Sequence, residues 1–547
     1  MDIQFNRNDD AMRLLLSNRK RALEKIYLGG GKKAIEKQHE KQKLTARERI
    51  DYLLDKDKPF VEIGSFAGYD MYHHEGGCPA GGTVGGIGYI GGRQCVVMAN
   101  DQTVKAGAWF PITGKKNLRL QEIAMENNLP IIYLVDSAGV FLPMQDEIFP
   151  DKEHFGRIFR NNARMSAMGI TQIAAVMGAC VAGGAYLPIM SDETLMVTGK
   201  GSIYLAGPYL VKAAIGENVD HETLGGAHTH NAISGIADYQ FETEQECLDE
   251  VKKLVGKLGK LPSAGFNRIE SREPAKDPKE LYGIFPEGNA RPYDVREIID
   301  RIVDADEKGE SSFDEFKKAY GKTIVCGYAR IDGWAAGIVA NHRTIVKSAK
   351  GEMQMGGVIY NDSADKAARF IMNCNQKKIP LVFLQDVTGF MVGSRSEHSG
   401  IIKDGAKLVN AVANSVVPKI TIITGNSYGA GNYAMCGKAY DPRFIYAWPT
   451  AKIAVMGGEQ AAKTLLQIQV AAKKGKGEEV TPEEEQTMLN HIIDKYNKQT
   501  TPYYAAARLW VDDIIDPLLT RQVISEGIHA ANHAGLKDDF KMGVVQV

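Results

Sequence analysis

The chain has 547 residues, of which 44% are hydrophobic and 24% charged, so it is long enough for two or more domains with their own cores. With 66 Lys and Arg against 67 Asp and Glu, its formal net charge is -1. This balance argues against a nucleic-acid-binding protein and a polybasic membrane binder, although a local basic patch stays possible. Apolar stretches such as 129–144 contain Asp136 and fall short of a membrane span, so we predict no transmembrane helix.

The amino terminus points to an intracellular protein. It carries Asp2, Asp9 and Asp10 and lacks both the apolar core of a signal peptide and the Arg-rich, acid-poor composition of a transit peptide. We expect the cytoplasm of a bacterium, or the mitochondrial matrix if the chain is the mature form of a eukaryotic protein. The seven cysteines are scattered and form no C-x-x-C pair, which indicates neither a disulfide framework nor a zinc ribbon.

The first 60 residues are charged and helical in pattern. Within 35–54 apolar residues recur near helical spacing, and Thr45 and Glu48 resemble a capping box. We expect this segment to be an arm or a cover on a neighbouring surface. Further on, 86–91 matches the dinucleotide-binding glycine pattern, but a strand follows it where a helix is required. We therefore interpret 86–91 as a glycine-rich hairpin.

Beyond residue 130, short β-rich apolar runs alternate with helical patterns. Strands are predicted at 131–136, 173–178, 194–198, 381–386, 420–424 and 443–448. Helices are predicted at 157–169, 183–191, 399–414, 429–437, 484–497 and 503–511. Alternation of this kind favours an α/β fold whose sheet is mainly parallel, since parallel strands are covered on both faces and look continuously apolar.

An internal repeat organises the chain. LPIIYLVDSAG (129–139) parallels IPLVFLQDVTG (379–389) at an offset of 250 residues. Three further pairs follow in the same order at offsets of 247, 250 and 241: 173–186 with 420–433, 203–207 with 453–457, and 86–100 with 327–341. This order predicts two homologous halves. Prolines and charges interrupt the pattern in 264–295, so we divide the chain into domains at 1–275 and 276–547.

Metal and phosphate-loop motifs are weak. His73-His74 and His228-x-His230 have no acidic or thiol residues clustered with them, so we expect surface loops and no metal site. Gly114-Lys115 lacks the required upstream glycine and is followed by Lys116 instead of Ser or Thr. Neither motif indicates a cofactor held by this chain.

Two glycine-rich segments carry the strongest chemical signal. CVAGGAY (180–186) and SYGAGNY (427–433) each lie between a predicted strand and a predicted helix. Backbone N–H groups at a helix start have no partner in the helix, and glycine allows a ligand oxygen to approach them. The recurrence favours two oxyanion holes, while glycine serving only tight strand–helix packing stays open. Ser137 is not expected to be a nucleophile, because Val135 occupies the position of the nucleophile-elbow glycine.

Over nearly its whole length the sequence resembles the carboxyltransferase β subunits of biotin-dependent acyl-CoA carboxylases. The resemblance is carried by long motifs at 29–50, 100–116, 133–159, 176–193, 403–413, 425–449, 455–462 and 507–521. LPMQDEIFPD followed by HFGRIF is similar to the methylcrotonoyl branch more than to the propionyl branch. Gln42 stands where the family usually has glycine, and Ala138 and Val140 alter the segment after Ser137.

The resemblance implies two crotonase-like (ClpP/crotonase) domains in tandem, a β6 homo-oligomeric core, and an active site between domains of different subunits. The implied partner is a biotin carboxylase and biotin carboxyl carrier subunit, with no nucleic acid and no membrane. The implied cofactor is carboxybiotin on that partner, and a coenzyme A thioester is the substrate. In the implied reaction carboxybiotin releases CO₂, the biotin enolate takes a proton from the acyl thioester, and the substrate enolate attacks CO₂. Two enolate oxygens then need two oxyanion holes.

The resemblance also assigns residues. Gly183 and Gly184 would hold the thioester oxygen, and Ala430 and Gly431 the ureido oxygen of biotin. Residues expected to line the ligand sites around them are Ser137, Ala138, Gly139, Ala185, Tyr428 and Gly429.

The expected substrate is 3-methylcrotonoyl-CoA, since 133–159, which adjoins the expected acyl site, resembles the methylcrotonoyl branch. Val140 and Phe141 add bulk there, which leaves a saturated short-chain or a longer acyl-CoA open. A propionyl-CoA or other acyl-CoA carboxylase β subunit and a glutaconyl-CoA-type decarboxylase subunit remain alternatives. A crotonase-like hydratase would need paired carboxylates, which the motifs lack. A non-catalytic scaffold would not be expected to keep both glycine pairs.

Overall fold

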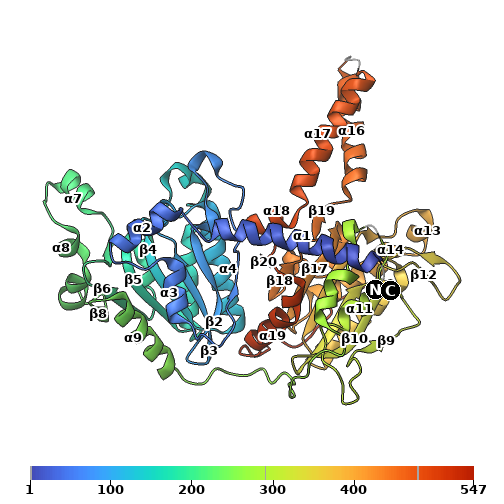
Figure 1. The fold of residues 1–547 in the computed structure, drawn as a ribbon, viewed down its shortest axis with the longest axis horizontal. Coiled ribbons are helices and arrows are strands. Elements are labelled where there is room, and N and C mark those ends of the chain that lie inside the picture. Colours follow the sequence, from blue (N-terminus) through green and yellow to red (C-terminus); the bar gives the residue numbers. More distant parts are fainter. Residues whose placement is uncertain (1–2, 290, 477–479, 537, 547) are drawn as a thin grey trace. The chain divides into compact units, whose positions relative to one another are not determined.

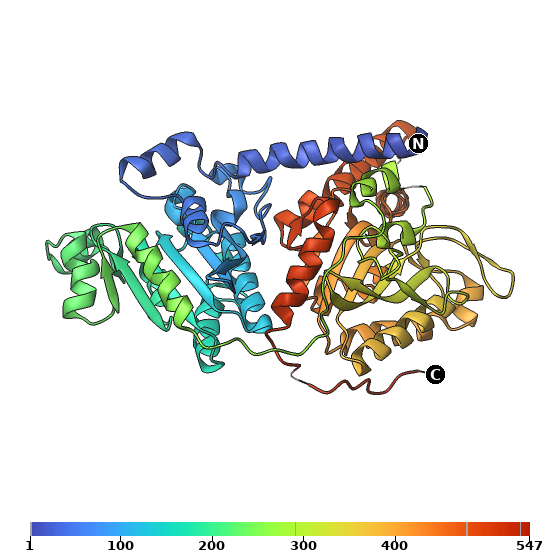
Figure 2. The same cartoon turned by 60° about the horizontal axis from the view of Figure 1, so that its bottom comes forward.

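The computed structural model describes residues 3–289, 291–476, 480–536 and 538–546 (Figures 1 and 2). The chain divides into two compact units. The N-terminal unit consists of Arg21–Ser263 and Ala507–Leu509, and the C-terminal unit of Met1–Lys20, Ala264–Ala506 and Trp510–Val547. The division into homologous domains between residues 275 and 276 stays a prediction.

The N-terminal unit is built on an eight-stranded mixed sheet of order β1-β2-β3-β4-β5-β6-β8, with β7 paired to β5. Its edge is antiparallel from β1 to β3, and the pairings from β3 onward are parallel. The strands are β1 (Val61–Glu62), β2 (Thr83–Ile90), β3 (Arg93–Asn100), β4 (Ile131–Ser137), β5 (Gln172–Val181), β6 (Glu193–Val197), β7 (Ser202–Tyr204) and β8 (Tyr239–Phe241).

The C-terminal unit repeats this sheet. Its order is β9-β10-β11-β15-β17-β18-β20, with β19 paired to β17, and the antiparallel and parallel pairings fall at the same places. The strands are β9 (Asp314–Phe316), β10 (Ile324–Ile331), β11 (Trp334–Asn341), β15 (Leu381–Val387), β17 (Lys419–Tyr428), β18 (Phe444–Ala447), β19 (Lys452–Ala454) and β20 (Asp513–Ile514). Two similar sheets in tandem confirm the predicted α/β fold.

Two short strand pairs lie outside the main sheets. β12 (Val346–Lys347) pairs with β13 (Met353–Gln354), and β14 (Val358–Ile359) pairs with β16 (Gly389–Phe390). The second pair holds Gly389, two residues after the end of β15, opposite Val358.

Helices cover both sheets. Those of the N-terminal unit are α2 (Lys32–Glu40), α3 (Ala46–Leu53), α4 (Pro111–Asn127), α5 (Phe155–Ala167), α6 (Tyr186–Ile189), α7 (Pro208–Ile215), α8 (His221–Gly225) and α9 (Glu244–Lys257), while α1 (Ile3–Ile26) contains residues of both units. Those of the C-terminal unit begin with α10 (Leu281–Ile284), α11 (Val295–Ile299), α12 (Asn361–Gln376), α13 (Ser394–His398), α14 (Ile401–Ala413) and α15 (Ala430–Ala434). Its remaining helices are α16 (Gly458–Gly475), α17 (Pro482–Gln499), α18 (Pro502–Ala507) and α19 (Thr520–Ala531).

Two helical features bear on the sequence predictions. α16 and α17 pack together as a hairpin that projects from the C-terminal unit (Figure 1). The helix predicted at 503–511 ends at Ala507, because Leu509 adopts a left-handed conformation with φ of +57°. Across the described part of the chain, no helix combines the length and the apolar character needed to cross a membrane.

The predicted glycine-rich hairpin is confirmed. β2 and β3 are joined by Gly91 and Gly92, whose φ values of +57° and +78° suit glycine. Their N–H groups donate to the Asp55 carboxylate at 2.9 and 2.7 Å. A strand follows the motif instead of a helix, so the geometry of a dinucleotide-binding loop is not formed here.

The capping box at the start of α3 is confirmed, and of its two predicted settings the arm is wrong, since α3 covers the sheet of its own unit. Thr45 accepts from the N–H of Glu48, and the Glu48 side chain accepts from the N–H of Thr45. However, Ala46, Ile50 and Leu53 are buried in the same apolar cluster as β3 and α9. The helix therefore belongs to the core of the N-terminal unit and is not an arm on another surface.

Candidate active site

The N-terminal glycine pair lies in a 3₁₀ helix, η5 (Ala182–Ala185), which directly follows β5. Ala182 begins it in a left-handed conformation with φ of +55°. Hydrogen bonds in a 3₁₀ helix join residue i to residue i−3, so the N–H groups of Ala182 and Gly183 have no acceptor inside it. The N–H of Gly184, one position further, can turn back to Val181. Gly183 is thus the better donor of the predicted pair.

The turn after β4 lies against this segment. The Ser137 hydroxyl donates to the carbonyl of Gly107 at 2.7 Å and accepts from the Trp109 indole N–H at 2.9 Å and the Gly139 N–H at 3.1 Å. A Cβ on Gly184 would lie 4.0 Å from the Cα of Gly139. The Ser137 hydroxyl therefore fixes this turn by three hydrogen bonds. The structure brings the predicted N-terminal site residues together, with Ala138 exposed and Ala185 in η5.

The C-terminal glycine segment opens α15. Gly429, with φ of +52°, donates its N–H to the carbonyl of Ala454 at 3.0 Å, and Asn432 donates its N–H to the carbonyl of Gly429 at 3.1 Å. The N–H groups of Ala430 and Gly431, at the first two helical positions, have no acceptor inside α15. Tyr428 ends β17 just before them, and burial raises its pKa to about 12.

In both halves the second glycine of the donor segment lies beside a glycine in the turn after the neighbouring strand, β4 or β15. A Cβ on Gly431 would lie 2.6 Å from Cγ2 of Val387 and 3.4 Å from the Cα of Gly389. Gly389 thus occupies the place that Gly139 has beside Gly184. Sequence reasoning missed Gly389 as a site residue, although its offset of 250 from Gly139 was a usable signal.

A buried charge cluster supports the N-terminal turn. Asp136, at an irregularity of β4, pairs with Lys43 at 2.5 Å and with Arg49 at 3.2 Å, and Arg49 also binds Glu244 at 2.8 Å. The side chains of Arg49, Asp136 and Glu244 are each about 1% exposed. Burial lowers the pKa of Lys43, which Asp136 partly opposes. Two cations against two carboxylates keep the cluster neutral.

The equivalent aspartate of the C-terminal unit has other partners. Asp386 accepts from the backbone N–H of Asn426 at 2.9 Å and from the Tyr293 hydroxyl at 3.0 Å, and it pairs with Arg343 at 3.4 Å. Burial raises the pKa of this carboxyl, while Arg343 lowers it. No motif in the sequence predicted either aspartate cluster.

Aromatic rings flank the N-terminal site. A Cβ on Gly183 would lie 3.0 Å from Cε1 of Phe155. The Phe155 ring packs edge-to-face on Trp109 and on Phe159, with centroids 4.8 and 5.0 Å apart. Phe141, expected at the acyl site, instead stacks on Phe110 at 4.2 Å in a separate apolar cluster. Within 133–159, the Phe155 ring thus lies beside Gly183.

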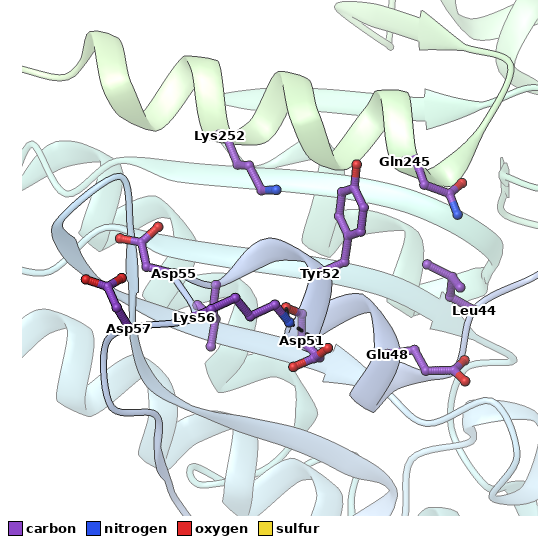
Figure 3. Close-up of a pocket in the computed structure, with 10 residues that line it drawn as sticks. Leu44, Glu48, Asp51, Tyr52, Asp55, Lys56, Asp57, Gln245 and Lys252 are labelled. Atoms are coloured by element: carbon purple, nitrogen blue, oxygen red, sulfur yellow. Dashed lines mark hydrogen bonds and ion pairs between the residues drawn. The ribbon is translucent and has the colours of Figure 1, made fainter.

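A groove of about 620 Å³ in the N-terminal unit contains none of the predicted site residues (Figure 3). It lies between α3 and α9 and is lined by four carboxylates and two lysines, which are Glu48, Asp51, Asp55, Asp57, Lys56 and Lys252. An acidic lining disfavours the phosphates of coenzyme A. We therefore do not assign the acyl-CoA site to this groove.

The histidines differ in environment. His73 is exposed, as expected of a surface loop. His230, in contrast, is buried, with its ring nitrogens 2.6 Å from the Ile203 carbonyl oxygen and 2.8 Å from the Ser234 hydroxyl. The expectation of a surface loop is wrong for His230, whose ring fills a packing role. Among the described residues no group of three or more His, Cys, Asp and Glu side chains could hold a metal ion.

Comparisons with known proteins identify the family. The model of the carboxyl transferase domain matches residues 37–541. The chain is 49% identical to the mitochondrial methylcrotonoyl-CoA carboxylase β chain of Arabidopsis thaliana, over 99% of this chain and 90% of that one. It is 47% identical to a biotin-dependent 3-methylcrotonyl-coenzyme A carboxylase β1 subunit of Mycobacterium tuberculosis, over 98% of each.

A solved structure agrees. The β subunit of geranyl-CoA carboxylase from P. aeruginosa is similar at a TM-score of 0.85 and 39% identity, covering 100% of this chain and 98% of that one. The chain therefore belongs to the carboxyl transferase family. Within it, the chain is the carboxyltransferase subunit of a biotin-dependent acyl-CoA carboxylase, as its sequence motifs predicted.

Proposed function

We propose that this subunit transfers the carboxyl group of carboxybiotin, carried by a partner subunit, to the γ carbon of 3-methylcrotonoyl-CoA. The observation that carries the proposal is the repeated pair of backbone donors, at Gly183 and Gly184 and at Ala430 and Gly431, in a chain of this family. The identity of 47–49% to proteins named methylcrotonoyl-CoA carboxylase β chains supports the substrate.

In this proposal the two donor pairs stabilise two developing enolate oxygens. Carboxybiotin, when bound, supplies both the CO₂ and the base. The N–H groups of Ala430 and Gly431 fit its ureido oxygen, since neither has an acceptor inside α15 and Gly431 has no Cβ to occlude them. On the other side the N–H of Gly183 donates to the thioester oxygen, and Gly184, whose N–H can also donate to the carbonyl of Val181, is the weaker second donor. Fixed donors of this kind stabilise charge that appears only in the transition state.

A second substrate remains a candidate. The match to a geranyl-CoA carboxylase β subunit over the whole chain favours a longer branched enoyl-CoA. Phe155 against Gly183 supports the shorter acyl group, because a ring packed on the donor segment limits the room beside it. Among the alternatives, propionyl-CoA carboxylation and glutaconyl-CoA-type decarboxylation stay open.

The assembly follows from the same proposal. A β chain of this family implies a biotin-bearing α partner, and we propose a β6 core in which domains of different subunits complete each active site. The compartment stays a prediction. Relatives include chains named mitochondrial and a bacterial chain, in line with either the mitochondrial matrix or the bacterial cytoplasm.

Substrate choice is tested by reconstitution with the biotin-bearing partner. We compare kcat/KM for 3-methylcrotonoyl-, propionyl-, butyryl- and geranoyl-CoA, and expect the first to be the best substrate. A pocket difference of one methylene changes discrimination by only about 1–3 kcal/mol, so the full series is needed. Propionyl-CoA winning by about tenfold or more would overturn the substrate while leaving carboxyl transfer intact.

The biotin-side donors are tested by Ala430→Pro. Proline is tolerated at the first position of a helix, so this change removes one N–H and keeps α15. We expect turnover to fall about 10²–10³-fold. Gly458→Pro is the matched control, since it opens α16 at the position where the other half already has Pro208. Full activity of folded Ala430→Pro would show that the donor is misplaced.

A further inference from the structure

The C-terminal donor segment is held by a buried side-chain network that the N-terminal segment lacks. Gln385 of β15 accepts at Oε1 from the Ser427 hydroxyl at 2.6 Å and donates from Nε2 to the Met435 carbonyl at 2.7 Å. Asn432 donates from Nδ2 to the Ser427 hydroxyl at 2.8 Å. Gln385 and Ser427 are fully buried, so neither bond competes with water.

The residues of this network lie on both sides of Ala430 and Gly431 in the sequence. Ser427 lies near the end of β17, before the turn through Gly429, and Asn432 lies in the first turn of α15 after it. Met435 immediately follows the helix. Gln385 thus connects the strand end to the helix end, and the Asn432 bond spans the turn that presents the N–H groups of Ala430 and Gly431.

The equivalent positions of the other half are apolar or weakly polar. At the repeat offsets of 250 and 247 residues, Gln385 corresponds to Val135, Ser427 to Cys180 and Asn432 to Ala185. The strand pairing agrees, because Cys180 is opposite Ser137 in β4 and Ser427 opposite Val387 in β15. The Cys180 thiol donates to the Gly184 carbonyl at 3.2 Å, but among the described residues no glutamine or asparagine bridges this turn.

We infer that Gln385, with Ser427 and Asn432, is a positioning residue for carboxyl transfer, which holds the Ala430 and Gly431 N–H groups in the geometry that the biotin ureido oxygen requires. The inference rests on the proposed function for the identity of that oxygen. A buried, fully satisfied polar network specifies one geometry, and a shift of about 1 Å at a reacting group can cost about 10²-fold in rate. None of the three side chains needs to touch a ligand in this role.

Two variants test the inference. Gln385→Met keeps the size of the side chain and removes its bonds to Ser427 and Met435. Asn432→Ala removes the bond to Ser427 and introduces alanine, the residue that the N-terminal half has at the equivalent position, Ala185. In the reconstituted enzyme we expect kcat to fall about tenfold or more for each. KM for 3-methylcrotonoyl-CoA should stay within about twofold, because acyl-CoA is held by the other donor pair.

Thr421→Val is the matched control. Thr421 is also fully buried on β17 and donates its hydroxyl to the Cys436 carbonyl at 2.8 Å, one residue beyond Met435. The variant therefore removes a bond to the same helix end but leaves the bridge between Ser427 and Asn432 across the donor turn in place. It should lower the melting temperature as Gln385→Met does and leave kcat unchanged. A loss of kcat in Thr421→Val equal to that in Gln385→Met would mean a structural effect and overturn the positioning role.

Hydrogen–deuterium exchange gives a readout that does not depend on activity. Exchange in 428–435 should rise at least about threefold in Gln385→Met and Asn432→Ala and stay at the wild-type rate in Thr421→Val. Unchanged exchange in both variants, or an unchanged kcat in both beside an active wild type, overturns the inference. An inactive wild type with the expected exchange pattern would instead contradict the proposed function alone.

Discussion

The two halves present the same backbone donors on the same strand order but hold them differently. In the C-terminal unit, Gly431 is packed against Val387 and the turn is bridged by Gln385. In the N-terminal unit, a Cβ on Gly184 would meet only the Cα of Gly139, at 4.0 Å. The comparison teaches that one donor segment is tightly packed, whereas the other has room beside it. Under the proposed function, the first would suit the single biotin ligand and the second an acyl group.

A second pair of equivalent residues extends the comparison to stability. Lys116 of α4 and Lys366 of α12 are 250 residues apart, and both are fully buried. The Lys116 ammonium donates to the carbonyls of Gly64, Ala80 and Thr83 at 3.0, 2.9 and 2.5 Å. The Nζ of Lys366 has no hydrogen-bond partner among the described residues. Lys116 thus stabilises its half by hydrogen bonds, whereas Lys366 costs its half the desolvation of an unpaired ammonium.

Replacing each lysine in turn should give the largest difference in the free energy of unfolding. Lys116→Met leaves three buried carbonyls without their donor, and we expect the free energy of unfolding to fall by about 3–5 kcal/mol. Lys366→Met removes only an unsatisfied ammonium and should be neutral or stabilising. Denaturant unfolding of the two variants checks this. Equal destabilisation by both would refute the asymmetry.

Adding one methyl group to each second donor should separate the sites by rate. Gly431→Ala forces a Cβ to 2.6 Å from Val387, which shifts the donors, and we expect about a 100-fold loss of turnover. Gly184→Ala meets ordinary contact distances and should cost no more than about threefold. Steady-state turnover of the reconstituted enzyme measures both. A larger loss of turnover in Gly184→Ala than in Gly431→Ala would show that the N-terminal donor segment, and not the C-terminal one, is the more tightly packed.

Much of this comparison was visible in the sequence. The repeat predicted two similar sheets, because a buried parallel strand must be apolar throughout and ends where glycine allows a turn. The bracing by Gln385 was not predicted, since a single polar residue in an apolar run has no periodicity. Its signal was the mismatch with Val135 at the repeat offset. The choice between an arm and a cover stayed open for α3, because an amphipathic pattern shows that a face is covered but not what covers it.

Stability should also depend on pH differently in the two halves. Burial lowers the pKa of Lys366 below its ordinary value of 10.5, so the folded chain binds fewer protons at this site than the unfolded chain. Stability therefore rises as pH increases through the lowered pKa and levels off above 10.5, by at most about 1.4 kcal/mol per pH unit.

Lys366→Met removes this slope, so its advantage over the wild type should shrink as the pH rises through the window below 10.5. Unfolding free energies of the wild type and of Lys366→Met at several pH values in that window provide the measurement, because the difference between the two proteins cancels the contribution of the other titrating groups. A constant difference between Lys366→Met and the wild type across the window would mean that Lys366 is not destabilised by burial.

The smallest effect on stability should come from substituting the residue that begins each donor turn. Ala182 and Gly429 are equivalent at the offset of 247, and their φ values of +55° and +52° are both positive. Alanine pays about 1–2 kcal/mol for this conformation, while glycine avoids that cost but loses about 0.5–1 kcal/mol more chain entropy on folding. Ala182→Gly should therefore stabilise the N-terminal unit by up to about 1 kcal/mol, seen as a small rise in its melting temperature. Gly429→Ala should act in the opposite direction, because a Cβ there would lie 2.8 Å from the carbonyl oxygen of Val455. If Ala182→Gly instead destabilised the unit, the left-handed alanine would be held by contacts that outweigh its strain, and the two turns would be less alike than their backbones indicate.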